Sequence, residues 1–461
     1  MKSVILLASL FMSLSASAEN WQSFQVEGLN KAQIRQQDIQ PHLQQIIDSP
    51  VFNVEHIGSS YLGRPIHRIK IGKGSTKLML WSQMHGDEST ATSALFDLMR
   101  RMEKDQGWRQ SWQDKLTIYM IPMLNPDGAE QATRTNAQGI DINRDARALQ
   151  TPEGRLLLAQ AKELKPDFGF NLHDQNRFYS AGHHNNPATI SLLAPAFNDR
   201  KSISPARHRA MQIIGVLKEV ADARIPEHLG RYDDTYAPRA FGDNLAGMGI
   251  STILIESGAH RQDPNRQVAR EMNLIMLSAA IDSIQSGSYA KQDLSAYTDI
   301  PFNRREAFRD VLMSDLLVKE GSQQYRIDLA IDLNLPNARQ PRIKEVGDLT
   351  VYSGFFEFDA NGWQFQPAKG YTLSDATTLT REDYLALLQQ GYGYFASDAD
   401  KLDNQSGLPM AFSNVSMSDT RPRAGHRAVF FLEHKDGRKI AVIEGLLIDL
   451  NSGKVLNSYS T

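Results

Sequence analysis

A histidine and a glutamate three positions apart are the residues of this chain best suited to chemistry. They are His85 and Glu88, and they follow the apolar run Leu78–Trp81. At the end of a buried strand, an imidazole and a carboxylate with this spacing can turn toward one small cation. Zinc accepts such nitrogen and oxygen ligands, and a catalytic zinc takes three protein ligands and leaves one position for water. The pattern therefore predicts a third ligand elsewhere in the chain.

The third ligand is predicted to be His173, which ends a second apolar run, Phe168–Leu172. Two other histidines, His183 and His184, are rivals for this position. They are adjacent in a loop rich in Gly, Asn and Pro, where side chains line a cleft or face solvent. The three expected ligands would hold one zinc ion per chain.

Alternating apolar and amphipathic segments between residues 77 and 286 predict the framework for these ligands. Buried strands are expected over Leu78–Met84, Leu116–Leu124, Phe168–His173 and Ile250–Ile255, and helices over Thr90–Lys104, Thr151–Lys165, Ala206–Ala221 and Gln267–Ser286. This order indicates an α/β domain whose mixed, mostly parallel sheet is covered by helices on both faces. Sites in such sheets lie at the carboxyl ends of the strands, where each expected ligand stands.

The first 18 residues have the pattern of an export signal. Lys2 precedes the apolar stretch Val4–Leu14, and Ala16-Ser17-Ala18 fits the small-x-small cleavage rule. The alternative, a buried N-terminal helix, agrees less well with the abrupt change to polar residues from Glu19. We therefore expect an exported protein, periplasmic or secreted. No later segment is long and apolar enough for a membrane helix, so no membrane insertion is expected.

The composition limits the remaining classes. The 461 residues include no cysteine, so an exported fold must do without disulfides and depends on a sizeable core. A net charge of −3 argues against nucleic acid as a partner. The length and a change to polar composition after residue 286 predict four parts: a signal peptide at 1–18, a catalytic domain at 19–290, a linker at 291–320 and a β-rich accessory domain at 321–461.

Within this division, Arg305–Leu317 could form a helix in the linker, whereas Tyr325–Leu333 alternates as a strand. Residues 428–448 give a hairpin signal with Asp436-Gly437 at the turn. The accessory domain is interpreted as a structural module or, alternatively, a binding module.

Between Val54 and Gly258 the chain resembles the zinc metallocarboxypeptidases related to carboxypeptidase A. The motifs that carry the resemblance occur in family order: His85-x-x-Glu88, Asn125-Pro126-Asp127-Gly128, Arg134, Gly139-Ile140-Asp141-Ile142-Asn143-Arg144, His173 and Ile253-Leu254-Ile255-Glu256-Ser257-Gly258. The resemblance implies a carboxypeptidase-like fold and zinc held by His85, Glu88 and His173.

The resemblance also implies roles for polar residues outside the ligand set. Glu256 matches the family's catalytic glutamate, which takes a proton from water and later delivers it to the leaving amine. Arg134 is expected to stabilise the oxyanion, because its charge is permanent. Arg144, whose planar fork suits a carboxylate, is expected to bind the substrate terminus together with Asn143.

Three features leave the specificity of such a site open. Asp145 places an acid directly after the expected carboxylate-binding Arg144. Tyr232 and Tyr236 compete for the role of the family's tyrosine. Asp243 falls near the position of the pocket acid in basic-selective members, so a preference for an amine-bearing terminal residue is one hypothesis.

Four further polar residues have a structural interpretation beside the functional one. Asn125 and Asp127 are interpreted as turn formers, because Asn-Pro-Asp-Gly is favourable turn chemistry. Asp87 and Asp174 adjoin ligands and either orient an imidazole or are simply solvated.

The sequence therefore predicts an exported zinc exopeptidase that acts on a C-terminal peptide or peptide-like amide bond. A murein-peptide amidase of the same fold is a close rival, so the expected partner is a peptide or a muropeptide. A catalytically silent binding protein is a third hypothesis, against which the complete ligand set and Glu256 argue. The oligomeric state is not predicted.

Overall fold

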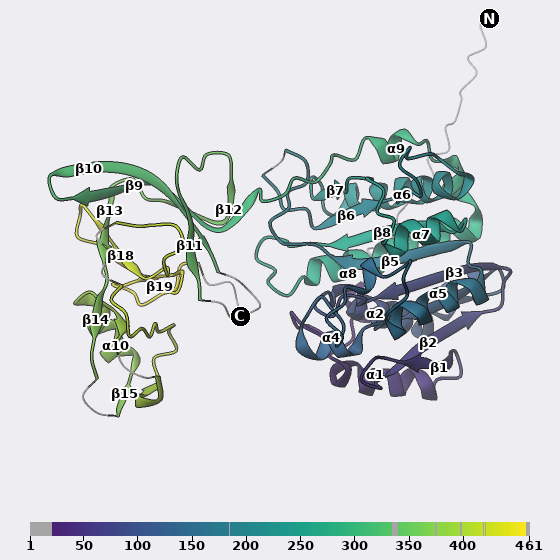
Figure 1. Cartoon of the computed structure of the whole chain (residues 1–461), viewed down its shortest axis with the longest axis horizontal. Helices are drawn as coiled ribbons and strands as arrows, with labels where there is room; N and C mark the ends of the chain where they lie inside the picture. Colours follow the sequence, from purple (N-terminus) through teal and green to yellow (C-terminus); the bar gives the residue numbers. More distant parts are fainter. Residues whose placement is uncertain are drawn as a thin grey trace, which may run out of the picture.

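The computed structural model describes residues 21–457, apart from 184, 334–339, 374–375, 397–398, 418 and 420. The expected signal peptide and the rival ligand His184 lie outside these residues. Two lobes follow one another along the chain, an N-terminal lobe up to α9 (Ser295–Thr298) and a C-terminal lobe from β9 (Phe308–Glu320) (Figure 1). In the part of the chain that is described, no helix is long and apolar enough to cross a membrane.

An eight-stranded sheet forms the centre of the N-terminal lobe, in the order β1-β2-β4-β3-β5-β8-β6-β7. Its strands are β1 (Asn53–Ser59), β2 (Pro65–Gly72), β3 (Thr76–Ser82), β4 (Leu116–Ile121), β5 (Phe168–Asp174), β6 (Ile190–Leu193), β7 (Leu229–Arg231) and β8 (Ser251–Ser257). The central strands β4, β3, β5 and β8 are mutually parallel, whereas β1, β2 and β6 add antiparallel pairs. The predicted mixed, mostly parallel sheet is confirmed.

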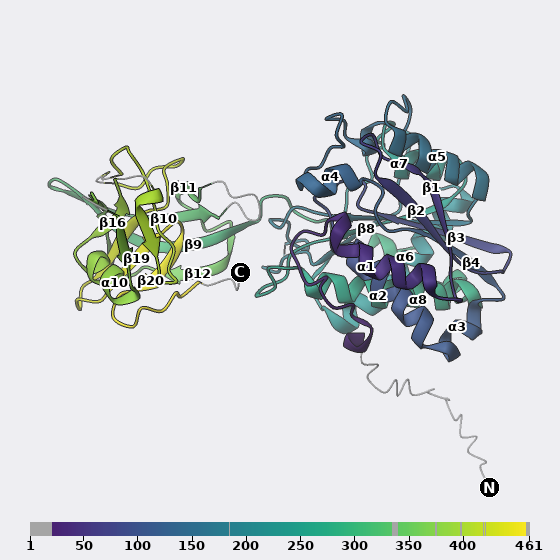
Figure 2. The same ribbon diagram turned by 90° about the horizontal axis from the view of Figure 1, so that it is seen from below.

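Helices cover both faces of this sheet, because its central strands are apolar on both sides. Strand β3 shows the division, since Leu78 and Leu80 face one core and Met79 and Trp81 face the other. The helices are α1 (Gln36–Asp48), α2 (Thr90–Lys104), α3 (Gln106–Trp112), α6 (Pro205–Arg224) and α8 (Gln267–Ser286) on the first face, and α5 (Pro152–Leu164) and α7 (Phe241–Gly247) on the second (Figure 2).

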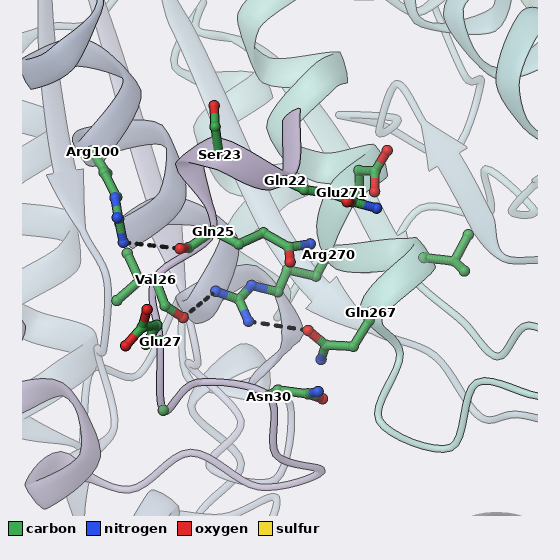
Figure 3. Close-up of a pocket in the computed structure, with 12 residues that line it drawn as sticks. Gln22, Ser23, Gln25, Val26, Glu27, Asn30, Arg100, Gln267, Arg270 and Glu271 are labelled. Carbon is green, nitrogen blue, oxygen red and sulfur yellow. Dashed lines mark hydrogen bonds between the residues drawn. The ribbon is translucent and has the colours of Figure 1, made fainter. Parts of the chain in front are cut away.

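A buried ion pair fastens the start of the described chain to α2 and α8. Arg270 donates to both oxygens of Asp97 at 2.7 Å, and both side chains are fully buried. The backbone of Val26 completes the arrangement, since its N–H donates to Asp97 and its carbonyl accepts from Arg270. Arg100 adds a hydrogen bond to the carbonyl of Gln25 (Figure 3). The N-terminal segment is thereby held across two core helices.

The C-terminal lobe is β-rich, as predicted. Its main sheet has the order β11-β10-β9-β13-β18-β19-β20, with β12 beside β9. After β9, these strands are β10 (Gln323–Asp332), β11 (Arg342–Gly347), β12 (Ser353–Asp359), β13 (Trp363–Pro367), β18 (Phe430–His434), β19 (Lys439–Ile443) and β20 (Leu446–Asp449). Two small two-stranded sheets pair β14 (Lys369–Tyr371) with β16 (Tyr392–Phe395) and β15 (Thr377–Leu379) with β17 (Leu402–Asn404), near α10 (Arg381–Gln389).

Two expectations for this region need correction. The possible helix over Arg305–Leu317 is wrong, because β9 occupies most of that range and pairs with β10 and β12. In β9 the buried residues are odd-numbered before the register shift (Val311, Met313) and even-numbered after it (Leu316, Val318). Asp315, at the shift, has a left-handed backbone with φ 61°. That one-residue shift imitates helical spacing. The expected linker at 291–320 thus contains both α9 and β9.

The hairpin predicted over residues 428–448 is present in its first half. Strands β18 and β19 pair antiparallel across the turn that contains Asp436-Gly437. The segment after the turn is two strands, not one, because a second tight turn at Glu444-Gly445 reverses the chain into β20.

We expect Asp97→Asn to destabilise the N-terminal lobe by about 3–5 kcal/mol, because Arg270 would keep a buried charge without its partner. Arg100→Gln, which removes a hydrogen bond from a half-buried side chain, should cost only about 1 kcal/mol. Urea unfolding of both variants, followed by tryptophan fluorescence, compares the two losses. Equal midpoints for Asp97→Asn and the unmodified protein would show that the pair does not stabilise the lobe.

Candidate active site

The loop between β3 and α2 carries His85 and Glu88, and its course depends on a glycine. A Cβ at Gly86 would lie 2.0 Å from the carbonyl carbon of Gly128, so only glycine permits this close approach of α4 (Pro126–Gln131). Asn125 caps α4 by accepting from Gly128 N–H and also donates to the carbonyl of Met84. The short helix α4 therefore packs against this loop and holds it in place.

Asn125 and Asp127 are structural, as the sequence indicated, although they open a helix and not only a turn. Asp127 is fully buried and accepts from Ser60 Oγ, Leu62 N–H and Arg64 Nη1. It therefore joins α4 to the connection between β1 and β2. Neither side chain lines the cleft described below.

The structure brings His85, Glu88 and His173 together at one point. Glu88 lies between the imidazoles, with Oε1 2.8 Å from His85 Nδ1 and Oε2 2.7 Å from His173 Nδ1. The two Nδ1 atoms are 3.1 Å apart. Ligands of a tetrahedral zinc at its usual bond lengths are separated by about 3.3 Å, so this donor set fits such an ion. The His85-Glu88-His173 cluster can hold a metal.

The two imidazoles of the cluster differ in how readily they bind a proton. Burial lowers the pKa of His173, and the nearby Glu88 does not compensate. Burial also opposes protonation of His85, but Glu88 and Asp141 together raise its pKa to about 9. A metal ion therefore competes with a proton at His85 and meets a neutral ring at His173.

Asp141 is a functional candidate that the sequence reasoning missed. Its Oδ1 lies 3.0 Å from His85 Nε2, which directs the other ring nitrogen, Nδ1, toward the cluster. Burial works against ionisation, but the hydrogen bond from His85 and the charge of Arg134 hold the pKa of Asp141 well below its usual value. Its position two residues before Asn143, in the motif quoted above, was the available signal.

Arg134 lies against the same cluster. Its Nη1 is 3.2 Å from Glu88 Oε1 and 3.1 Å from His85 Nδ1, and its Nε donates to Asp141 Oδ2 at 2.9 Å. The side chain is partly exposed, so its free edge faces the cleft. Asp141 thus positions both a ligand imidazole and this guanidinium.

Glu256 lies beside the cluster because of strand register. Strands β5 and β8 are parallel neighbours, and His173 is paired directly with Glu256. Burial raises the pKa of Glu256 well above its usual value, and the charge of Glu88 adds to the effect. A carboxyl group in such surroundings binds a proton more readily than a glutamate in water does.

The two acids next to the ligands differ. Asp174 is buried, accepts from Thr90 N–H and Oγ1, and pairs with Arg266 at 3.2 Å. Burial raises its pKa to about 6, although Arg266 opposes the shift. It therefore joins β5 to α2 and does not contact an imidazole, whereas Asp87 is exposed at the edge of the cleft.

A cleft of about 1060 Å³ surrounds the cluster and also contains most of the expected substrate-binding residues. Those that line it are Arg134, Asn143, Arg144, Tyr232, Asp243 and Glu256. Tyr236 and His183 are not among the lining residues, and His183 is exposed. Of the two competing tyrosines, only Tyr232 reaches the cleft.

The wall around Arg144 comes from η2 (Ile142–Arg144) and α7. Arg144 Nη1 donates to the carbonyl of Asn143, and Asn143 Oδ1 accepts from Phe241 N–H, which fixes which end of its amide can donate to a ligand. Asp243 accepts from Ala237 N–H. Burial raises the pKa of Asp243 to about 6, against the effect of that hydrogen bond and of Arg144.

Asp145 does not interfere with Arg144. Its buried carboxylate accepts from Gln150 N–H and from the N–H and hydroxyl of Thr151, the residue that caps α5. The acid that follows Arg144 in the sequence therefore fixes the start of a helix and is absent from the lining of the cleft.

Fold and site together define a mixed α/β protein in which two histidines and one glutamate, placed so that they could hold a metal ion, lie at the carboxyl ends of the central strands. Residues 43–177 match the family model described as zinc carboxypeptidase. The chain is 28% identical over 102 residues to "Carboxypeptidase 2" of Trichophyton rubrum, covering 22% of this chain and 19% of that protein. It thus spans about a fifth of the length of the curated relatives it matches.

Solved structures with a similar chain path include two bacterial proteins. A metallo-carboxypeptidase from Burkholderia cenocepacia is 17% identical at a TM-score of 0.45, covering 56% of this chain and 71% of that chain. One from Pseudomonas aeruginosa is 19% identical at a TM-score of 0.45, covering 55% and 70%. The match over residues 43–177 relates this part of the chain to the zinc carboxypeptidases.

We expect the protein to bind one zinc ion per chain and His173→Ala to lose it. Asp141→Asn should lower zinc affinity by about 10- to 100-fold, because it removes the acceptor that orients His85. Metal analysis and competition with a chromogenic chelator measure both effects. His183→Ala is the matched control and should bind zinc normally; a loss there instead of at His173 would overturn the ligand assignment.

Proposed function

We propose that this chain is a zinc-dependent exopeptidase that hydrolyses C-terminal peptide or peptide-like amide bonds. The observation that carries the proposal is the register of β5 and β8, which sets Glu256 beside His173 at a cluster suited to zinc. The signal pattern at residues 1–18 supports an exported location.

The expected zinc ligands, Glu256 and Arg134 each have a task in this reaction. Zinc, when bound by His85, Glu88 and His173, supplies Lewis acidity and lowers the pKa of water. Glu256 accepts the proton of the attacking water and returns it to the leaving amine, for which its raised pKa is suited. Arg134, held by Asp141, donates toward the carbonyl oxygen as negative charge develops there.

The substrate is oriented by the wall around Arg144. A guanidinium that lines the cleft on a different element from the cluster can take the terminal carboxylate, with the Asn143 amide as a neutral donor. Asp243 lies on the same wall and can receive a cationic terminal side chain when ionised. Such a carboxylate is present in ordinary peptides and in cell-wall peptides alike, so a murein-peptide amidase remains the alternative.

Glu256→Gln should keep its zinc and lose about 10²- to 10⁴-fold in kcat, as expected for removal of a general base. The assay uses a panel of tripeptides and muropeptides, with metal content measured on the same samples. Release of C-terminal residues from the tripeptides, abolished by a chelator, supports the exopeptidase. Turnover of muropeptides alone would select the amidase, and binding without turnover by the unmodified protein would contradict both enzymes.

Selectivity for a terminal Lys or Arg should rise by up to about tenfold between about pH 5 and 7, because Asp243 with a pKa near 6 is neutral below that range and ionised above it. The measurement is the ratio of kcat/KM for Lys-terminated and Leu-terminated peptides at each pH. Asp243→Asn should make this ratio independent of pH. A rise that persists in Asp243→Asn would assign the selectivity to another group.

A further inference from the structure

The C-terminal lobe and the segment that leads into it contribute to the wall of the active-site cleft. Arg305, Asp310 and Phe355 line the same cavity as the zinc-cluster residues. Arg305 lies in the segment that joins the lobes, between α9 and β9, whereas Asp310 and Phe355 lie in β9 and β12 of the C-terminal lobe. The cleft is thus built from both lobes, and residues 175–179, which follow β5, also line it.

Backbone hydrogen bonds fix the segment that carries Arg305. Ser180 and Arg304 exchange two hydrogen bonds, of 3.0 and 3.1 Å, and Ala307 N–H donates to the carbonyl of Phe178 at 2.9 Å. The joining segment therefore runs as a short ladder beside the chain that leaves β5. Arg305 is held at a defined place relative to His173.

Side chains continue this connection toward Glu256. Arg305 Nε donates to the hydroxyl of Tyr179 at 2.7 Å, and the Tyr179 ring lies 5.5 Å from that of Tyr232. Burial is the main cause that raises the pKa of the Tyr232 hydroxyl, and the charge of Glu256 is the second. Tyr232 is therefore close to Glu256. Arg305 is thus separated from the catalytic region by two aromatic side chains.

Arg177 and Arg305, the two arginines of this wall, differ in whether a carboxylate neutralises them. Arg177 pairs with the buried Asp310 at 2.6 Å and stacks 4.8 Å from the Phe355 ring. Arg305 is exposed, and among the described residues no carboxylate lies within 4.0 Å of it. Its Nε is used by Tyr179, which leaves the two terminal nitrogens of the fork for a ligand.

We propose that Arg305 is a specificity-determining residue that binds a carboxylate of the substrate on the N-terminal side of the scissile bond. The inference rests on the proposed function. A substrate whose terminus is bound at Arg144 and whose scissile amide lies at the cluster must continue past the cluster. The Tyr179–Arg305 wall then receives the residue about one or two positions upstream. Acidic side chains at that position bind best.

The test compares N-acylated tripeptides that differ only in a Glu, Gln or Lys at the first or second position. The unmodified protein should prefer Glu over Gln in kcat/KM by about three- to tenfold at one of these positions, and added salt should reduce the preference. Arg305→Gln should abolish the preference, and Arg305→Lys should retain part of it. A muropeptide pair with free and amidated carboxylates forms a second arm and shows which source of the carboxylate is used.

Arg304→Gln is the matched control, because Arg304 is an exposed neighbour that donates to Val351 and does not line the cleft. It should leave the preference unchanged. An equal loss in both variants would show only a general effect of positive charge. A uniform loss of turnover on all peptides in Arg305→Gln would show that Arg305 merely supports Tyr179. Either result overturns the proposal.

Binding separates this inference from the proposed function. The zinc-loaded Glu256→Gln variant should bind the Glu peptide more tightly than the Gln peptide, and the double variant with Arg305→Gln should bind both alike. If no peptide is hydrolysed but this discrimination is present, the exopeptidase proposal fails and the Arg305 site stands. If peptides are hydrolysed but the Glu and Gln peptides bind alike, the exopeptidase proposal stands and the Arg305 proposal fails.

Discussion

The convergence of two imidazoles and one carboxylate at a buried point is the interaction on which the rest of this molecule depends. Glu88 lies within 2.8 Å of one ring and 2.7 Å of the other. Polar groups at this depth are costly unless they are paired or bind a metal. The parallel strands bring these residues together, since β3 and β5 end at the same edge of the sheet and both histidines lie there.

The surroundings of the cluster are arranged to keep it rigid. Gly86 admits α4 beneath the loop, Asp141 fixes one imidazole, and Asp174 ties the end of β5 to α2. Loss of a residue that holds a ligand in this way typically lowers metal affinity by about 10- to 100-fold. A site of this kind is therefore a property of several elements at once.

The C-terminal lobe changes how the cleft should be understood. Phe355 of this lobe and Arg305 of the joining segment line it, and the Arg177–Asp310 pair crosses between the lobes. A β-rich region that seemed separate along the chain is in contact with the catalytic wall. Under the proposed function, the part of the substrate that extends away from its terminus is the part this lobe would contact.

The sequence alone predicted the four central strands, the helices α2, α5, α6 and α8 that cover them, and the candidate ligands, because local periodicity and the residues at strand ends report burial and position directly. It could not fix strand β9, whose shifted alternation at Asp315 imitates a helix. Nor could it show that Asp141 orients His85, that Asp145 caps α5, or that Tyr232 and not Tyr236 faces the cleft. Those outcomes depend on contacts between residues far apart in the chain, or on the direction of a single side chain, and only the packed tertiary structure decides them.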